Sequence, residues 1–313
     1  MSRPRIAVVV CTHNREDRLR GLFAALRAQD VPEEDWELLV VDDGSTDGTP
    51  EVLAEVAAAG DLPLRVHRME NAGPSVARDE GWRRTSAPLV AFTDDDCEPA
   101  PDWLSTLLEH HDAQPEAVVQ GRTEPIPREV GLLGPNSRTQ RVQRCGPYFQ
   151  TCNIAYPRTW LERVDGFDRS FGWGGEDCDL AWRCIEAGAK VRWAPEALVH
   201  HAVVQLGGRA YLRQSQRFTD SMRLYRRHPG LRGVALTWSV FYKASHQLLL
   251  QSLIGVLLAR RHPAWLLLTY PYLKQLERRW AGSPQWAPMI VAHDVLEVGA
   301  TVRGAIRHRT VVL

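Results

Sequence analysis

The chain has 313 residues, 44% of them hydrophobic and 24% charged, as expected for a globular protein with a sizeable buried core. Its 38 basic residues balance 38 acidic residues, so no overall field attracts nucleic acid or an anionic membrane. The six cysteines form no CxxC pair, which disfavours a disulfide scaffold and a zinc site. Arginine greatly outnumbers lysine, which we interpret as the signature of a GC-rich bacterial genome.

The first apolar run is short, and polar residues follow it at once, so it is typical of a first strand rather than a signal peptide. We therefore expect a cytoplasmic protein. Strand and helix patterns then alternate along the first part of the chain. The predicted strands are Ile6–Val10, Glu37–Val41, Leu64–His67 and Leu89–Phe92, and the predicted helices are Leu19–Gln29, Thr49–Ala59 with Thr49 as its cap, and Pro74–Arg84.

Apolar strands separated by helices indicate an α/β fold with a mostly parallel sheet covered on both faces. Further along the chain we predict a loop over residues 122–147, a strand at Tyr148–Tyr156, a helix at Gly175–Gly188 and a strand at Ala189–His201. The sequence from about residue 206 predicts mainly helices. Because ligands of such sheets bind at the carboxyl ends of the strands, the polar residues that follow each strand are the candidates for a site.

Three adjacent carboxylates, Asp94, Asp95 and Asp96, follow the strand at Leu89–Phe92. Their mutual repulsion is costly unless a cation is present, and divalent cations with oxygen ligands are the usual partners. On an extended segment, Asp94 and Asp96 point to the same side, so both could bind one Mg²⁺ or Mn²⁺. The structural alternative is a solvated turn before a helix at Pro101.

Two more polar segments follow strands: Cys11–Asn14 (CTHN) after the first, and Asp42–Gly48 (DDGSTDG) after the second. Asp-Gly and Ser-Thr pairs are ordinary turn and cap residues, so a purely structural role is an equal alternative. Position favours a binding role, because both segments are expected at the sheet edge that carries the aspartate triplet. A carboxylate there can accept a hydrogen bond from a base N–H.

A fourth polar segment, Gly172–Asp179 (GWGGEDCD), opens the later helix. Glu176 and Asp177 fall in its first turn, where the helix dipole favours negative charge, so capping is the structural alternative. Two glycines, an aromatic residue and two acids together indicate a close approach of the backbone to a ligand. A carboxylate held beside a sugar can take the proton from an incoming hydroxyl.

Together these segments resemble the family 2 glycosyltransferases of the GT-A fold, in order and spacing, at Val8–Asn14, Val40–Gly48, Asn71–Gly81, Phe92–Pro99 and Gly172–Arg183. The resemblance covers about residues 5–201. It implies a Rossmann-like GT-A catalytic domain over residues 1–205, with a nucleotide-sugar half at about 1–121 and an acceptor half at about 122–205. A helical C-terminal region would follow over residues 206–313.

The resemblance also implies roles for residues that bind the donor. Thr12 and Asp43 correspond to nucleoside contacts, with Asp43 on the pyrimidine base, and Arg78 borders the base or the diphosphate. The triplet Asp94–Asp96 corresponds to the DXD motif of the family. Within it, Asp94 and Asp95 face the donor, Asp94 and Asp96 bind metal, and Asp96 is the most direct metal ligand.

For the reacting end of the site, the resemblance implies Asp177 as the catalytic base, with Glu176 beside it meeting acceptor or sugar hydroxyls. Trp173 would stack on an acceptor sugar, although packing in the core is an equal alternative for it. Some GT-A enzymes add a histidine metal ligand after the next strand. His200 and His201 both lie there, and we prefer His201.

These roles imply an inverting, hexosyltransferase-type enzyme with a UDP-sugar as the expected donor and Mn²⁺ or Mg²⁺ as cofactor. The cation neutralises charge on the departing diphosphate. Asp177 takes the acceptor proton as the oxygen attacks the anomeric carbon, and the single displacement inverts the configuration. An ionised aspartate is a weak base, which suffices when proton transfer is late.

Residues 233–274 contain apolar runs of about a dozen residues, shorter than the roughly 20 that a membrane span requires. Three interpretations stay open: helices packed on the catalytic domain, peripheral contact with the inner face of the membrane, and a homodimer interface. The acceptor also stays open between a lipid-linked glycan, a polysaccharide and a natural product.

Three other functions are less well supported. A sugar nucleotidyltransferase has a similar sheet but requires a glycine-rich phosphate loop after the first strand, which CTHN is not. A magnesium phosphohydrolase requires an aspartyl nucleophile after the first strand, where none occurs. A non-catalytic nucleotide-sugar-binding or scaffold protein would have no need for both intact acidic clusters.

Overall fold

The computed structural model describes residues 3–172, 174–280 and 282–313, and it divides into two compact units. The first unit contains the chain up to residue 130 together with residues 139–203. The second unit contains residues 131–138 and 204–313. The short segment 131–138 therefore belongs to the second unit although the sequence places it inside the expected catalytic domain.

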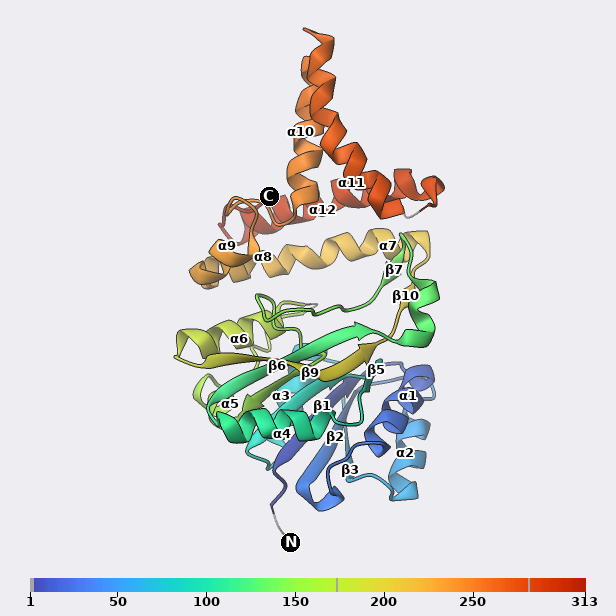
Figure 1. Cartoon of the computed structure of the whole chain (residues 1–313), viewed down its shortest axis with the longest axis vertical. Coiled ribbons are helices and arrows are strands. Elements are labelled where there is room, and N and C mark those ends of the chain that lie inside the picture. Colours follow the sequence, from blue (N-terminus) through green and yellow to red (C-terminus); the bar gives the residue numbers. More distant parts are fainter. Residues whose placement is uncertain (1–2, 173, 281) are drawn as a thin grey trace. The chain divides into compact units, whose positions relative to one another are not determined.

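The first unit is built on an eight-stranded sheet with the order β3-β2-β1-β4-β8-β6-β9-β5 (Figure 1). The first four strands in this order run parallel to one another. Strand β8 runs antiparallel to both of its neighbours, and β5 runs antiparallel to β9. The strands are β1 (Ile6–Thr12), β2 (Trp36–Asp43), β3 (Leu64–Met69), β4 (Leu89–Asp94), β5 (Cys97–Pro99), β6 (Ala117–Pro125), β8 (Ile154–Pro157) and β9 (Lys190–His201).

Helices cover both faces of this sheet, as the apolar strands predict. In β1, Ile6, Val8 and Val10 belong to one core cluster, which also holds apolar residues of α1, α2 and α4. Val9 belongs to the other cluster, with residues of α3, α5 and α6. The helical segments are α1 (Glu16–Arg27), η1 (Glu33–Asp35), α2 (Thr49–Ala59), α3 (Pro74–Arg83), α4 (Trp103–Ala113), η2 (Pro127–Leu132), α5 (Arg158–Arg163) and α6 (Glu176–Glu186).

Three local predictions are wrong. The expected strand at Tyr148–Tyr156 is confined to β8, because Phe149 has a φ of 51°, a left-handed conformation that a strand does not accommodate. The expected loop over residues 122–147 begins with the second half of β6, whose irregular pairing at Gly121/Arg122 hides the strand pattern. Thr49 does not cap α2: Gly48 is the N-cap residue, and Thr49 Oγ1 accepts from Arg15 N at 2.8 Å.

The described residues of the second unit are mainly helical and include the antiparallel pair β7 (Ser137–Arg138) and β10 (Val204–Gln205). Within the described residues, no helix is both long enough and apolar enough to cross a membrane. The helical segments are α7 (Gly208–Arg213), η3 (Gln214–Arg217), α8 (Phe218–Arg227), α9 (Pro229–Ala235), α10 (Ala244–Leu258), η4 (Pro263–Thr269), α11 (Tyr270–Trp280), η5 (Pro284–Trp286) and α12 (Ala287–Arg307).

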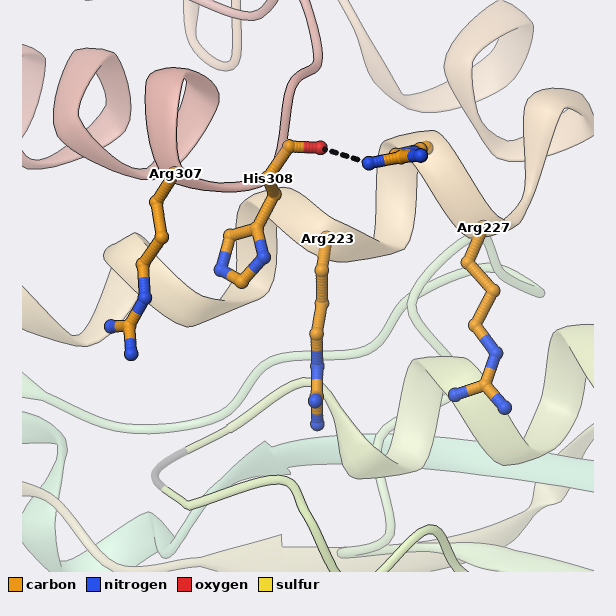
Figure 2. Close-up of a pocket in the computed structure, with 5 residues that line it drawn as sticks. Arg223, Arg227, Arg307 and His308 are labelled. Atoms are coloured by element: carbon orange, nitrogen blue, oxygen red, sulfur yellow. Dashed lines mark hydrogen bonds between the residues drawn. The ribbon is translucent and has the colours of Figure 1, made fainter.

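A basic pocket of about 390 Å³ lies at the ends of α8 and α12 (Figure 2). Arg226 donates to the main-chain carbonyl of His308 at 3.2 Å and so ties the two helix ends together. Cationic side chains in the last turn of a helix are favoured by the helix dipole, which accounts for the positions of Arg226, Arg227 and Arg307 without a ligand. The lining residues are Arg223, Arg226, Arg227, Arg307 and His308.

Two buried carboxylates on α12 hold the neighbouring helices. Glu297, 1% exposed, accepts from Lys243 Nζ at 2.6 Å and lies 3.2 Å from His246 Nε2. Asp294, fully buried, accepts from Tyr272 Oη at 2.8 Å and from Arg279 at 2.6 Å. Burial alone would raise the pKa of Glu297, but the His246 hydrogen bond and the Lys243 charge outweigh it and lower the pKa to about 2.

Glu297→Gln is expected to lower the free energy of unfolding by about 3 kcal/mol near pH 7, since it leaves the buried His246 and the partly exposed Lys243 without their carboxylate partner. Because the folded pKa is depressed, this contribution is present above the unfolded pKa of about 4.5 and is lost as the pH falls towards 2. Urea unfolding of both proteins across this pH range measures it. Glu277→Gln, which removes an exposed ion pair with Lys274, is the control and should change stability by less than about 0.5 kcal/mol. Equal effects of the two substitutions would contradict the assignment.

Candidate functional site

The loops that follow β1 and β2 are tied to each other at the carboxyl edge of the sheet. Asn14 N donates to Ser45 Oγ at 2.9 Å, and Thr46 N donates to Asn14 Oδ1 at 2.8 Å. Asn14 has a φ of 55°, a conformation that asparagine tolerates better than most residues. Thr12 pairs in register with Asp42, so the predicted nucleoside-binding segments lie side by side.

Asp43, predicted to contact the base, is 4% exposed and organises the loop at the start of α3. Its two carboxylate oxygens accept from Ala72 N at 2.7 Å and Gly73 N at 2.9 Å. Gly73 has a φ of 95°, so the loop needs glycine to present its N–H in this way. Asp43 therefore has a structural role, and its predicted contact with a base stays a prediction.

The aspartate triplet lies at a tight connection rather than on an extended segment. Asp94 ends β4, Asp95 and Asp96 form the turn, and β5 begins at the next residue. Asp95 and Asp96 are each 7% exposed. Burial, with the adjacent charge of Asp96, raises the pKa of Asp95 to about 7, and Arg15, whose Nε lies 3.5 Å from Asp95 Oδ1, opposes that rise.

The pairing of β5 with β9 brings His201 to the triplet. Cys97 is opposite His201 in this antiparallel pair. The carboxylates of Asp94 and Asp96, Cys97 Sγ and one imidazole nitrogen of His201 each offer an atom within 4.8 Å of the others. His200, the alternative considered from the sequence, is not among the grouped residues.

The orientation of His201 suits a metal ligand. Its Nδ1 lies 2.9 Å from the main-chain oxygen of Ala202, which can only accept, so Nδ1 carries the hydrogen. That leaves Nε2 facing Asp96 Oδ1 at 3.4 Å, an arrangement that requires a proton or a cation between the two atoms. A hydrogen-bonded Nδ1–H with Nε2 turned to a cation is the usual second-shell arrangement of a metal-binding histidine.

The donor set therefore fits a divalent cation. Carboxylate oxygens from Asp94 and Asp96 suit Mg²⁺ and Mn²⁺, and imidazole favours Mn²⁺ over Mg²⁺. Cys97 is fully buried, and burial raises the pKa of its thiol well above the ordinary value. Its thiol is expected to stay protonated and to pack beneath the site.

Arg78, on α3, joins the triplet to the start of α6. One guanidinium nitrogen donates to Asp94 Oδ1 at 2.9 Å, and another donates to Glu176 Oε1 at 2.6 Å. Burial would lower the pKa of Arg78, but the charges of Asp94 and Glu176 outweigh it and raise the pKa, so the side chain is cationic. Acidic groups far apart in the sequence thus converge on one largely buried guanidinium, which is 13% exposed. The predicted contact of Arg78 with the donor stays a prediction.

The first turn of α6 carries two carboxylates, Glu176 and Asp177, which differ in burial and in hydrogen bonding. The positive φ of Gly174 and Gly175, 102° and 101°, sets the entry into the helix and explains the paired glycines. Glu176 is 4% exposed, and its Oε2 has no hydrogen-bond partner among the described residues. Asp177 is partly exposed and, among the described residues, accepts a hydrogen bond only from Cys178 N, at 2.7 Å. Trp173, predicted to contact the acceptor, lies outside the described residues.

Burial raises the pKa of Asp177 to about 7, and the neighbouring charge of Glu176 adds to this effect. Arg78 and the Cys178 N–H act in the opposite direction, and Asp94 also raises the pKa. A carboxyl group with a pKa near neutrality is a stronger base than an ordinary aspartate. Asp177 is also adjacent in the chain to Glu176, which Arg78 joins to Asp94 of the triplet.

Asp79, which the sequence analysis did not single out, anchors the loop that precedes α6. It is fully buried on α3, and its Oδ1 accepts from Trp82 Nε1 at 2.8 Å and from Phe167 N at 3.1 Å. Its Oδ2 accepts from Arg83 Nε at 3.0 Å and Arg169 Nε at 2.7 Å. A buried carboxylate with four donors thus fixes the loop at Phe167 and Arg169 to α3.

Arg15 is the other site residue that sequence reasoning missed. It follows CTHN directly, and its side chain is 32% exposed beside Asp95. The signal that could have found it is its place in the first loop at the sheet edge, next to a cluster of three acids.

The family model for glycosyl transferase family 2 matches residues 7–174, and the model for glycosyl transferase family group 2 matches residues 132–293. The first match covers more than half of the chain. The chain therefore belongs to glycosyl transferase family 2, and the family predicted from its motifs is confirmed.

Two curated relatives illustrate the similarity. Validoxylamine A glucosyltransferase of Streptomyces hygroscopicus subsp. limoneus is 30% identical over 273 residues, which cover 73% of this chain and 58% of the relative. Pre-mycofactocin glycosyltransferase of Mycobacterium tuberculosis is 33% identical over 208 residues, 63% of this chain and 42% of the relative. The chain thus spans about half the length of these relatives.

Among solved structures, the mannosyltransferase PcManGT from Pyrobaculum calidifontis, in complex with GDP-Man and Mn²⁺, superposes with a TM-score of 0.62 at 22% identity. The match covers 98% of this chain and 88% of that one. It confirms the predicted GT-A-like α/β fold with a helical C-terminal region.

Arg78→Gln is expected to destabilise the protein by about 3 kcal/mol at pH 8 in metal-free buffer, because it leaves Asp94 and Glu176 without their shared cation. The loss should be smaller at pH 5, where carboxylates with raised pKa values take up protons. Chemical unfolding at both pH values measures the difference. The matched control is Arg20→Gln, which removes an exposed pair with Glu55 and should have little effect. A loss that is the same at both pH values would contradict this account.

Proposed function

We propose that the protein is an inverting glycosyltransferase that moves a sugar from a nucleoside diphosphate donor to an acceptor hydroxyl. The observation that carries this proposal is the convergence of Asp94, at the end of β4, and Glu176, at the start of α6, on Arg78, with Asp96 and His201 beside them. Family membership supports the reaction class, and both curated relatives are named as transferases of sugars.

Asp94, Asp96 and His201 would hold the divalent cation. When bound, such a cation stabilises the charge on the leaving diphosphate. Mn²⁺ is the metal we expect, because the set includes an imidazole, and the complex of PcManGT contains Mn²⁺. Arg15, partly exposed beside Asp95, is a second positive group near the expected position of the diphosphate.

Asp177 would act as the general base. As the acceptor oxygen bonds to the anomeric carbon, the bond from that carbon to the diphosphate oxygen breaks, and the acceptor proton passes to the Asp177 carboxylate. A single displacement from the opposite face inverts the anomeric configuration. The raised pKa of Asp177, about 7, supports this role because the group then has real affinity for the proton near neutral pH.

Thr12, Asp43 and the donor-facing side of the triplet would bind the nucleotide. The resemblance favours a UDP-sugar, whereas PcManGT was solved with GDP-Man, so donors of both bases belong in the test. Glu176 Oε2, buried without a partner in the described part of the chain, would accept from a sugar hydroxyl. The acceptor is expected to offer a hydroxyl on a glycan or a natural product.

Asp177→Asn tests the base. We expect kcat to fall by at least about 100-fold while the affinity for the nucleotide sugar changes little, because the amide keeps the shape but not the basicity. Donor turnover with Mn²⁺ and a panel of UDP-, dTDP- and GDP-sugars, with binding followed calorimetrically, measures both quantities. Asp102→Asn, an exposed change at the start of α4, is the control. If no nucleotide sugar binds the unmodified protein, a scaffold role replaces this proposal.

His201→Ala and His200→Ala form a matched pair of adjacent changes. We expect His201→Ala to weaken Mn²⁺ binding at least tenfold, because it removes the imidazole that faces Asp96, and His200→Ala to leave binding nearly unchanged. Electron paramagnetic resonance of free Mn²⁺ measures the affinity without any substrate. Weaker binding in His200→Ala alone would reverse the assignment.

A further inference from the structure

The helical unit carries an exposed apolar surface on α10, η4 and α11. Its side chains are 43% to 75% exposed, well above what a packed helix of a soluble unit shows. We name it the hairpin surface, because α10 and the following segment run side by side in Figure 1. Its members are Leu253, Ile254, Val256, Leu257, Trp265, Leu266, Leu267, Tyr270 and Leu273.

The hairpin that carries this surface is closely packed. Gly255, on α10, lies so near η4 that a Cβ atom there would be 2.7 Å from the main-chain oxygen of Trp265. The side chains of Tyr272 and Leu276, on α11, are each 5% exposed. The exposed apolar residues thus lie on the outer side of the hairpin, whereas the side chains on its inner side are already packed.

The part of the chain that contains the hairpin surface is rich in positive charge. No aspartate or glutamate occurs from residue 221 to residue 276, although the whole chain has a net charge of zero. Such a segment is attracted to a negative surface, since each basic residue close to an anionic membrane contributes about 1 kcal/mol. Lys243 and Lys274 pair with Glu297 and Glu277, which lie outside this segment. The cationic residues of the segment are Arg223, Arg226, Arg227, Arg232, Lys243, Arg260, Arg261 and Lys274.

Helix α10 is too short to span a membrane, so the hairpin can contact a bilayer only at its surface. Helix α10 has 15 residues, about 22 Å at 1.5 Å per residue, against a hydrocarbon thickness of about 30 Å. Arg260 and Arg261 are exposed at the turn between α10 and η4, where full insertion would carry them into hydrocarbon. In a hairpin that lies along the interface, both arginines reach the head groups.

We propose that the hairpin surface binds the anionic face of a lipid bilayer as a monotopic element, without crossing it. Apolar side chains enter the boundary between head groups and acyl chains, while Trp265 and Tyr270 take the interfacial position that aromatic residues prefer. Charge complementarity favours an anionic lipid surface over a second copy of this chain, whose hairpin would bring the same exposed Arg260 and Arg261. This inference goes beyond the transfer reaction and does not depend on it.

Flotation of the full chain with vesicles tests the proposal. We expect binding to phosphatidylcholine vesicles that contain about 30% phosphatidylglycerol and much weaker binding to phosphatidylcholine alone. Raising the salt concentration should weaken binding, because it shortens the screening length from about 10 Å at 0.1 M. The double variant Leu257→Glu/Leu267→Glu, at positions 66% and 75% exposed, should bind at least tenfold less without loss of fold.

The control is Ile306→Glu, which adds one negative charge, against two in the double variant, at an apolar position 74% exposed on α12, outside the hairpin. It should bind vesicles like the unmodified protein, and thermal unfolding should be similar for all variants. Equal binding of the double variant and the control would overturn the proposal. So would a stable dimer in sedimentation velocity that Leu257→Glu/Leu267→Glu dissociates in the absence of lipid, because a second copy would then be the partner.

Discussion

The site depends on how buried negative charge is compensated. Arg78 is the group that makes the arrangement possible, because it bonds Asp94 at the end of β4 and Glu176 at the start of α6. Without a cation, carboxylates from these two elements would repel each other in a poorly solvated space. One guanidinium can bridge two carboxylates in a fixed geometry, which the single ammonium of a lysine does less well.

The arginines compensate the negative charge of the buried carboxylates only in part, and this remaining charge suits the site to a cation. Burial, and after it the charge of a neighbouring carboxylate, raises the pKa values of Asp95 and Asp177 to about 7, and Arg15 and Arg78 offset these effects only in part. His201 turns its Nε2 atom towards Asp96 Oδ1, 3.4 Å away. A divalent cation would relieve the repulsion, and the protein would in turn bind it more tightly than isolated carboxylates could.

The sheet and the edge that carries the site could be predicted from sequence, because β1, β2 and β4 are continuous apolar runs followed by polar turns. Strand β6 could not, since Gln120 and Thr123 are buried polar residues and a bulge interrupts the pattern. Buried polar groups that find partners within the fold look like loop residues in a sequence.

The contacts that assemble the site were beyond sequence reasoning for a related reason. The salt bridges of Arg78 and the anchoring role of Asp79 depend on how α3 packs against α6 and its preceding loop, which no local pattern encodes. His201 could be proposed from the family resemblance, at the end of a predicted strand. Its choice over His200 rests on the register of the three-residue strand β5 against β9, which positions Cys97 opposite His201.

The most direct test of the central claim is anomalous diffraction from crystals grown with Mn²⁺ and a nucleoside diphosphate. The account predicts one strong manganese peak within bonding distance of Asp96 and of Nε2 of His201, with the diphosphate on the side of Arg15 and with Asp177 facing the space beyond it. A manganese peak elsewhere, or a diphosphate bound away from the turn between β4 and β5, would contradict it.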